Sequence, residues 1–153
     1  MAGNENKILV AAPITATNAE IVQACLDAFG RGDTDTILNA CAENVDVIFT
    51  GDQSIIPYAG QWKGKTRVAE YFRAISESVD VLKWNPQHYI GSGDRVAASG
   101  TMDLRVKATG KTITDTPWAV HFTVGNGKLT GWQVYTDTAA AEKAFTATSK
   151  ASG

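Results

Sequence analysis

Histidine and cysteine, the side chains that most often bind zinc or act as nucleophiles, are scarce in this sequence. Its 153 residues include two of each. The histidines, His88 and His121, lie far apart, so the close spacing of a zinc site is missing. Cys25 and Cys41 each fall within an apolar pattern of helical period, which is typical of small core residues in a reducing compartment. We therefore expect no metal, no cofactor, no disulfide and a cytoplasmic location.

An excess of positive charge is also missing, as is any long hydrophobic run. The formal net charge is −2, which gives the chain no basic surface for the phosphates of nucleic acid. The apolar run at residues 8–12 is too short to span a bilayer, and no basic segment of a signal peptide precedes it. We therefore expect neither nucleic acid nor a membrane as a partner.

Apolar residues at helical spacing dominate the first half of the chain. They predict helices over residues 19–29, 34–42 and from 66 onward, with a strand over 45–49. Asn18 is expected to cap the first helix, and Asp33 or Thr34 the second. Residues 51–64 are expected to form a long loop.

The second half changes to a period of two. Four strands are predicted, over about residues 80–91, 95–108, 112–124 and 128–137, with short glycine-containing turns between them and a last helix over 139–145. Helices followed by such a meander indicate an α+β fold. We expect a single domain over 18–146, an N-terminal extension over 1–17 and a disordered tail over 147–153.

Alternation along these strands predicts one apolar face, which should meet the helices. Trp118, Val120 and Trp132 fall on that face. His88 shares the face by alternation with Trp84, which makes His88 the only ionisable group expected there. A single bulge would reverse that assignment.

The opposite face is expected to mix large polar and aromatic side chains, namely Tyr89, Arg105, His121 and Tyr135. Sheets with such a face often pack against a partner. A solvated surface is the alternative that alternation leaves open.

Four stretches of the chain, in their order and spacing, carry a resemblance to a known family. They are AFGRGDTDTIL, PYAGQWKGKTRVAEYF, GDRVAASGTMDLRVKATGK and GNGKLTGWQVYTDTAAAEKAF. Together they resemble the NTF2-like superfamily, and within it the SnoaL-like and ketosteroid-isomerase-related proteins, over residues 18–146. The resemblance implies an NTF2-like cone, in which a curved, mostly antiparallel sheet wraps around three N-terminal helices and a deep pocket. It also implies a homodimer packed through the outer sheet face.

The resemblance further implies which residues line the pocket. The positions of catalytic groups in the isomerases, limonene epoxide hydrolases and polyketide cyclases look like Cys25, Phe49, Gly100, Met102, Val120 and Val134 here. Phenylalanine, valine and methionine cannot move a proton, so those mechanisms are expected to be lost. The expected ligand contacts are Cys25, Phe49, Tyr58, Trp62, Met102, Trp118, Val120, Trp132 and Val134. For Tyr58 and Trp62 the alternative is packing of their loop on the third helix, and for Trp118 and Trp132 it is an ordinary core role.

One catalytic residue of the related families has a counterpart in this sequence. The segment QHYIGSGDRV resembles the QHFIG segment of the scytalone dehydratases, whose histidine lies in the pocket and works with water; that histidine falls on His88. The alternative for His88 is a buried neutral imidazole bonded to Tyr58, a carbonyl or water.

Two functional classes follow. In the first, the protein is an enzyme that isomerises, cyclises or dehydrates a small apolar, oxygen-bearing molecule, such as a polyketide, steroid or terpenoid, through His88. In the second, it is a ligand-binding or accessory protein of the same fold, whose pocket holds such a molecule without turnover.

Overall fold

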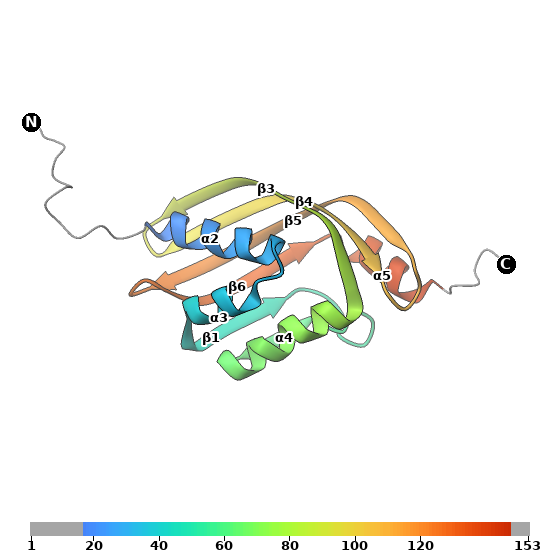
Figure 1. The fold of residues 1–153 in the computed structure, drawn as a ribbon, viewed down its shortest axis with the longest axis horizontal. Helices are drawn as coiled ribbons and strands as arrows, with labels where there is room; N and C mark the ends of the chain where they lie inside the picture. The colour runs from blue at the N-terminus through green and yellow to red at the C-terminus, as the bar shows by residue number, and fades with distance from the viewer. Residues whose placement is uncertain (1–16, 148–153) are drawn as a thin grey trace, which may run out of the picture.

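Three helices lie across one face of a curved, open sheet of six strands (Figure 1). The computed structural model describes residues 17–147. The helices are α2 (Asn18–Gly30), α3 (Thr34–Ala40), α4 (Lys65–Ser78) and α5 (Thr138–Thr146); the strands are β1 (Cys41–Phe49), β2 (Gly60–Lys63), β3 (Val79–Ser92), β4 (Arg95–Val106), β5 (Thr112–Gly125) and β6 (Lys128–Thr136). The predicted α+β fold, with a curved sheet around three helices, is confirmed. The predicted N-terminal extension and disordered tail lie, apart from Thr17 and Ala147, outside the described residues.

The strands are ordered β2-β1-β6-β5-β4-β3 across the sheet. Strand β1 runs parallel to β6, and all other neighbouring strands are antiparallel. Strands β3 to β6 form the predicted meander and match the predicted ranges to within two residues at each end. Short turns between period-two segments therefore predicted this part of the sheet well.

Side-chain caps set where the helices begin. The hydroxyl of Thr17 accepts a hydrogen bond from the Glu20 N–H, and the Glu20 carboxylate accepts one from the Thr17 N–H, which together form a capping box. Thr17 is therefore the N-cap of α2, and the prediction of Asn18 was wrong by one residue. Asp33 caps α3, as predicted, and Asp137 caps α5.

The region around β1 departs from the prediction in two ways. Helix α3 ends at Ala40, because Cys41 adopts an extended backbone and begins β1, so the predicted helix was two residues too long. Strand β2 lies within the predicted loop and pairs with β1 from Asp46 to Phe49. Four residues are too few for alternation to reveal a strand, and glycines with positive φ lie at its first residue, Gly60, and directly after it, Gly64.

Strand β3 lies at the edge of the sheet and is irregular. Its register against β4 shifts twice, the second time between Pro86 and His88. Each shift adds a residue to β3, so the side chains beyond it change face. Tyr89, opposite Ala98, is consequently half-buried toward the helices, whereas His88 and Ile90 are exposed.

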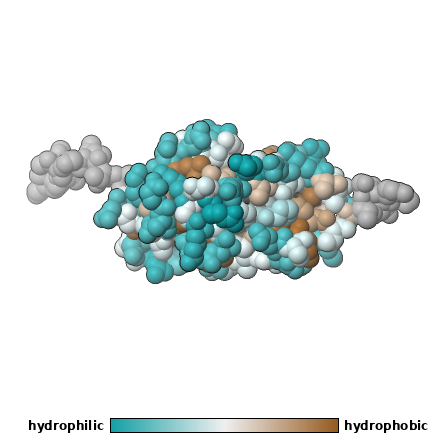
Figure 2. Space-filling model, turned by 90° about the horizontal axis from the view of Figure 1, so that it is seen from below, coloured by the Kyte–Doolittle hydropathy of each residue, from teal (hydrophilic) through white to brown (hydrophobic). Residues whose placement is uncertain are grey.

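The helices turn polar side chains to solvent and apolar ones to the sheet. On α4, Val68, Tyr71 and Phe72 are buried, while Arg67 and Arg73 are exposed. Figure 2 shows a largely hydrophilic face, with hydrophobic residues visible only in small patches. The large apolar side chains gather instead between helices and sheet, in one core cluster.

Candidate functional site

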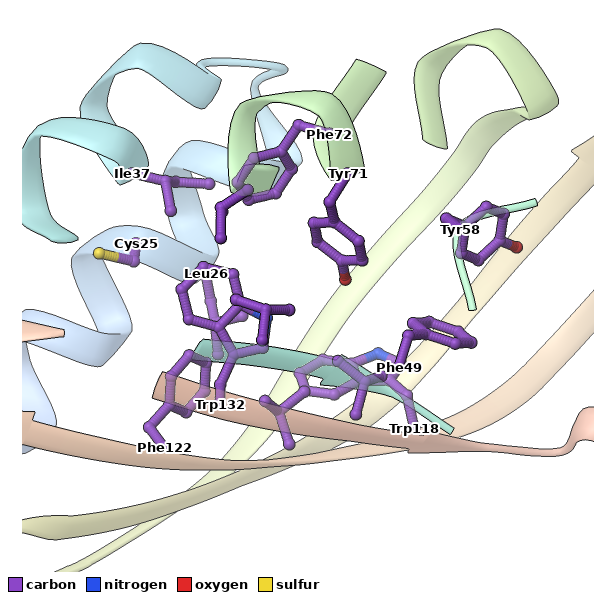
Figure 3. Close-up of a cluster of buried hydrophobic side chains, with 14 of the residues drawn as sticks. Cys25, Leu26, Ile37, Phe49, Tyr58, Tyr71, Phe72, Trp118, Phe122 and Trp132 are labelled. Atoms are coloured by element: carbon purple, nitrogen blue, oxygen red, sulfur yellow. The ribbon is translucent and has the colours of Figure 1, made fainter. Parts of the chain in front are cut away.

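An apolar cavity of about 100 Å³ lies within this core, between the helices and the facing side of the sheet. Helices α2, α3 and α4 supply one wall and strands of the sheet supply the other (Figure 3). An apolar cavity of roughly 150 Å³ holds benzene, whereas pockets for drug-sized ligands measure roughly 300–1,000 Å³. The cavity therefore has the scale of a single ring.

Eight of the nine predicted contact residues line this cavity: Cys25, Phe49, Tyr58, Met102, Trp118, Val120, Trp132 and Val134. Strand alternation brings most of them there, since β4, β5 and β6 turn every second side chain toward the helices. Their position is established by the structure, while their role in binding a ligand stays a prediction.

Trp62 is the exception, because it lies behind the cavity wall. It is buried on β2, where its indole N–H donates to the carbonyl of Tyr58 at 3.2 Å. Its ring packs 5.9 Å from that of Tyr71, and the guanidinium of Arg67 lies 4.7 Å from its centroid. The expectation that Trp62 lines the cavity was wrong. Trp62 instead packs against Tyr71 and bonds to Tyr58, and these two residues line the cavity.

His88 lies outside the cavity altogether. It is exposed on the sheet face that turns away from the helices, opposite Ser99. The bulge after Pro86 reverses the alternation on which the inward prediction rested, so that prediction was wrong. An imidazole on this face cannot reach a molecule held between helices and sheet.

Two phenols, Tyr58 and Tyr71, and the hydroxyl of Thr136 are the polar side-chain oxygens among the described residues that line the cavity. Figure 3 shows the Tyr71 hydroxyl pointing from α4 toward the sheet, and the Tyr58 hydroxyl pointing away from the cluster. Desolvation raises the pKa of Tyr71 well above its ordinary value, and hydrogen bonding from the Trp132 indole lowers it by less. Burial likewise raises the pKa of Tyr58. Both groups are therefore neutral hydrogen-bond donors at pH 7.

The thiol of Cys25 is the third ionisable group of the wall. Burial raises its pKa to about 11, and burial together with the nearby Cys25 raises the pKa of Cys41 to about 12. Neither cysteine forms a disulfide. Because a thiol rather than a thiolate is present at neutral pH, Cys25 is a poor nucleophile and acts as apolar wall.

The alternation and helical patterns did not single out Tyr71 as a site residue, although a signal was present. Tyr71 belongs to the apolar stripe that predicted the third helix, with Val68, Phe72 and Ile75. That stripe faces the sheet, so any polar group within it must face the cavity or the core. A hydroxyl within such a stripe was the available signal.

The wall approaches solvent between the helices and β3, and again at Thr136 near the end of β6, which is half-buried. Val81 is 37% exposed, and Phe29 and Ile75 are half-buried; all three line the cavity. They come from the ends of α2 and α4 and the beginning of β3. A small molecule would enter most readily between these elements.

Charge is absent from the cavity. Among the described residues that line it, there is no aspartate, glutamate, histidine, lysine or arginine. Within residues 17–147, no three potential ligands cluster as a metal site would require, and no helix has the length and apolarity needed to cross a membrane.

The model of the SnoaL-like domain matches residues 22–132, which is most of the chain. The protein belongs to the SnoaL-like family. An NTF2-like protein from Burkholderia xenovorans LB400 is 32% identical to it, over 84% of this chain and 95% of the other, with a TM-score of 0.74. The comparison with curated proteins found no match.

Two more distant structures share the fold of this SnoaL-like protein. One, from Jannaschia sp. CCS1 and proposed to be a SnoaL-like polyketide cyclase, is 19% identical over 89% of this chain and 96% of its own, with a TM-score of 0.71. The other, TerC co-crystallised with polyporic acid, is 22% identical over 84% of this chain and 97% of its own, with a TM-score of 0.72.

The SnoaL-like protein has apolar residues where the resemblance placed catalytic groups of related enzymes. Phe49, Met102, Val120 and Val134 all line the cavity. Each presents carbon or sulfur where a proton-transfer group would be needed. The fold is thus shared, and the loss of the acid–base groups of those enzymes at these positions stays a prediction from the resemblance.

Proposed function

We propose that this SnoaL-like protein binds a small, uncharged, mainly apolar molecule of about one aromatic ring that carries a hydrogen-bond-accepting oxygen. The observation that carries the proposal is the Tyr71 hydroxyl, a neutral donor directed into an apolar cavity. Within the described residues, the hydrogen-bond partner that affects the pKa of this hydroxyl is the Trp132 indole, which is a donor and leaves the Tyr71 O–H to donate elsewhere. A ligand oxygen would complete its hydrogen bonding, because buried polar groups are rarely left unpaired.

The walls favour an aromatic ligand. Phe49, Phe122, Trp118 and Trp132 surround the cavity with flat rings, against which a planar molecule packs closely. A steroid or a fused polyketide would need a larger space than about 100 Å³. We therefore favour a smaller ligand than the sequence alone suggested.

Acid–base catalysis receives little support from the wall. A general acid or base works best when its pKa lies near the working pH. The three ionisable groups of the wall, Cys25, Tyr58 and Tyr71, all have a raised pKa. With His88 on the other face, binding without turnover is the class that the site supports better.

The relatives agree with a small-molecule ligand. TerC was co-crystallised with polyporic acid, and the Jannaschia protein is proposed to be a polyketide cyclase. These two proteins are 19–22% identical to this chain and share its fold. They support a small organic ligand as the class, without indicating which compound this protein binds.

Calorimetric titration with anisole and with benzoate tests the proposal. We expect saturable binding of anisole and no binding of benzoate, because a carboxylate would lose its hydration in a cavity without cations. Equal affinity for the two, or no binding of any neutral single-ring compound, would contradict it. Native mass spectrometry of the purified protein would then identify what co-purifies.

A homodimer through the outer sheet face is also proposed. Ile90 is 72% exposed and Tyr135 47% exposed on that face, where His121 also lies. Tyr89, predicted to belong there, is turned to the opposite side by the bulge in β3, and Ile90 takes its place. Light scattering of the wild type should give twice the monomer mass. The Tyr135→Lys variant should give a lower mass, because a charged side chain would weaken the interface. A wild-type mass equal to that of the monomer at high micromolar concentration would refute the dimer.

The unpaired cysteines Cys25 and Cys41 support a reducing compartment, such as the cytoplasm. Fractionation of the native host, followed by immunodetection, would test that location.

A further inference from the structure

We propose that Phe145, on α5, positions Tyr58 and thereby closes one end of the cavity, so that the C-terminal helix limits the size of ligand accepted. The packing part of this proposal is independent of any ligand. The part about ligand size rests on the proposed function.

Tyr58 lies in segment 50–59, which connects β1 and β2 and belongs to neither strand. Its ring packs edge-on against Phe49, with centroids 4.9 Å apart and planes at 87°. On another side it meets Phe145, with centroids 6.0 Å apart and planes at 63°. Figure 3 places Tyr58 and Phe49 at one end of the cavity cluster, with Cys25 and Ile37 at the other. The end wall is therefore a ring held in place by two other rings.

The backbone of segment 50–59 contributes less restraint than a strand would. At its start the Thr50 N–H donates to the Val134 carbonyl of β6, and its other described backbone bonds are local turns, from Ile55 and Ile56 to Asp52 and from Ala59 to Ile56. The indole of Trp62 adds one bond to the Tyr58 carbonyl. The contact with Phe145 therefore adds to the restraint that the Phe49 ring and the buried side chains of Ile56 and Ala59 place on Tyr58.

Helix α5 is well anchored for this task. Ala141 and Ala144 are buried, and the Thr109 hydroxyl donates to the Ala144 carbonyl at 2.7 Å. At the start of α5, Thr138 lies next to Gly51, at the start of the segment that carries Tyr58. Two points of α5 thus support the same segment.

Helix α5 begins at Thr138, beyond residues 22–132 that match the SnoaL-like domain. The Tyr58 wall is thus held in part by an element that lies beyond residues 22–132 and outside the six-stranded sheet. A change at Phe145 can therefore alter this wall without altering a strand.

The test compares Phe145→Ala with Phe145→Leu, which keeps apolar bulk, and with Val124→Ala. Val124 is buried on β5 away from the cavity wall, so its truncation destabilises the core without touching Tyr58. Affinities for anisole and 1-methoxynaphthalene are measured by calorimetry. We expect Phe145→Ala to shift the affinity ratio toward the two-ring compound by about two- to tenfold, the range of one aromatic pair. Phe145→Leu should shift it less, and Val124→Ala should leave it unchanged.

Hydrogen exchange of the amides of residues 55, 56 and 59 gives a readout that needs no ligand. Exchange there should rise by about two- to tenfold in Phe145→Ala and stay at the wild-type rate in Val124→Ala. An unchanged affinity ratio together with unchanged exchange would overturn the role of Phe145. Equal changes of the affinity ratio and of the exchange rates in Val124→Ala and Phe145→Ala would also overturn the role of Phe145. If even wild type binds neither compound, the proposed function fails, and exchange alone decides whether Phe145 positions Tyr58.

Discussion

The indole rings of Trp84 and Trp118 stack face to face, with centroids 4.5 Å apart and planes within 3° of parallel. The Trp84 N–H donates to the carbonyl of Leu26 at 2.9 Å, and the Trp118 N–H donates to the carbonyl of Thr101 at 3.1 Å. Both rings line the cavity. Stacking and hydrogen bonds together fix their orientation, so this side of the cavity is rigid.

Gly100→Ala should disrupt that rigid side. A Cβ at Gly100 would lie 2.2 Å from the carbonyl oxygen of Asn85 and 2.9 Å from Cζ2 of Trp118. Neither the backbone nor the stacked ring can move freely, so we expect a loss of roughly 3 kcal/mol in the free energy of unfolding. Urea denaturation measures it. Gly91→Ala is the control, because its nearest atom would lie at an ordinary 3.6 Å; equal losses in both variants would argue against the tight packing of Gly100.

His88→Ala should leave both stability and ligand binding nearly unchanged. The side chain is exposed on the face away from the cavity, where substitutions usually change stability by less than about 0.5 kcal/mol. Thermal unfolding and an anisole titration check this. A large fall in anisole affinity would show that His88 reaches the cavity after all.

Thr17→Ala should lower the free energy of unfolding by about 1 kcal/mol, because it removes the hydroxyl that accepts a hydrogen bond from the Glu20 N–H. The other bond of the α2 capping box is donated by the backbone N–H of residue 17, which alanine keeps. Urea denaturation, with Gln23→Ala on the exposed side of the same helix as the comparison, measures the loss. If the two variants lost equal stability, the cap would contribute nothing.

Stability should fall as the pH rises above about 8.5, the ordinary pKa of a thiol. The folded-state pKa values of Cys25 and Cys41 are raised to about 11 and about 12, so their contribution is fully present below the unfolded pKa. Between the two pKa values the unfolded chain releases its thiol protons first, which favours unfolding. Urea denaturation from pH 7 to pH 10 should show this decline, and the double variant Cys25→Ala/Cys41→Ala should show a smaller one. If stability declined equally in wild type and in the double variant, groups other than Cys25 and Cys41 would cause the pH dependence.

The regular strands explain how much of this site the sequence could predict. Met102, Trp118, Val120, Trp132 and Val134 lie on strands whose inward residues follow a plain period of two over the cavity. Their placement needed only the choice of which face is apolar.

The irregular segments explain what the sequence could not predict. The bulge before His88 follows Pro86, and a proline within a strand is typical of an edge strand or a bulge, but it does not fix which residue is the extra one. The bulge nevertheless reverses every side chain beyond it. Strand β2 forms because β1 offers a free edge, which is a tertiary cause. The role of Phe145 depends on α5 packing on a distant segment, which no local pattern encodes.

Binding of anisole and ethylbenzene to wild type and to Tyr71→Phe tests the central claim most directly. The two compounds match in shape and differ by an ether oxygen, so their affinity ratio isolates the hydrogen bond from Tyr71. Tyr58→Phe is the control, because the Tyr58 hydroxyl points away from the cluster. Tyr71→Phe should lower the anisole-to-ethylbenzene affinity ratio by about two- to tenfold, and Tyr58→Phe should leave it unchanged. A ratio that is the same in wild type and Tyr71→Phe would contradict the assignment of Tyr71 as the ligand's hydrogen-bond donor.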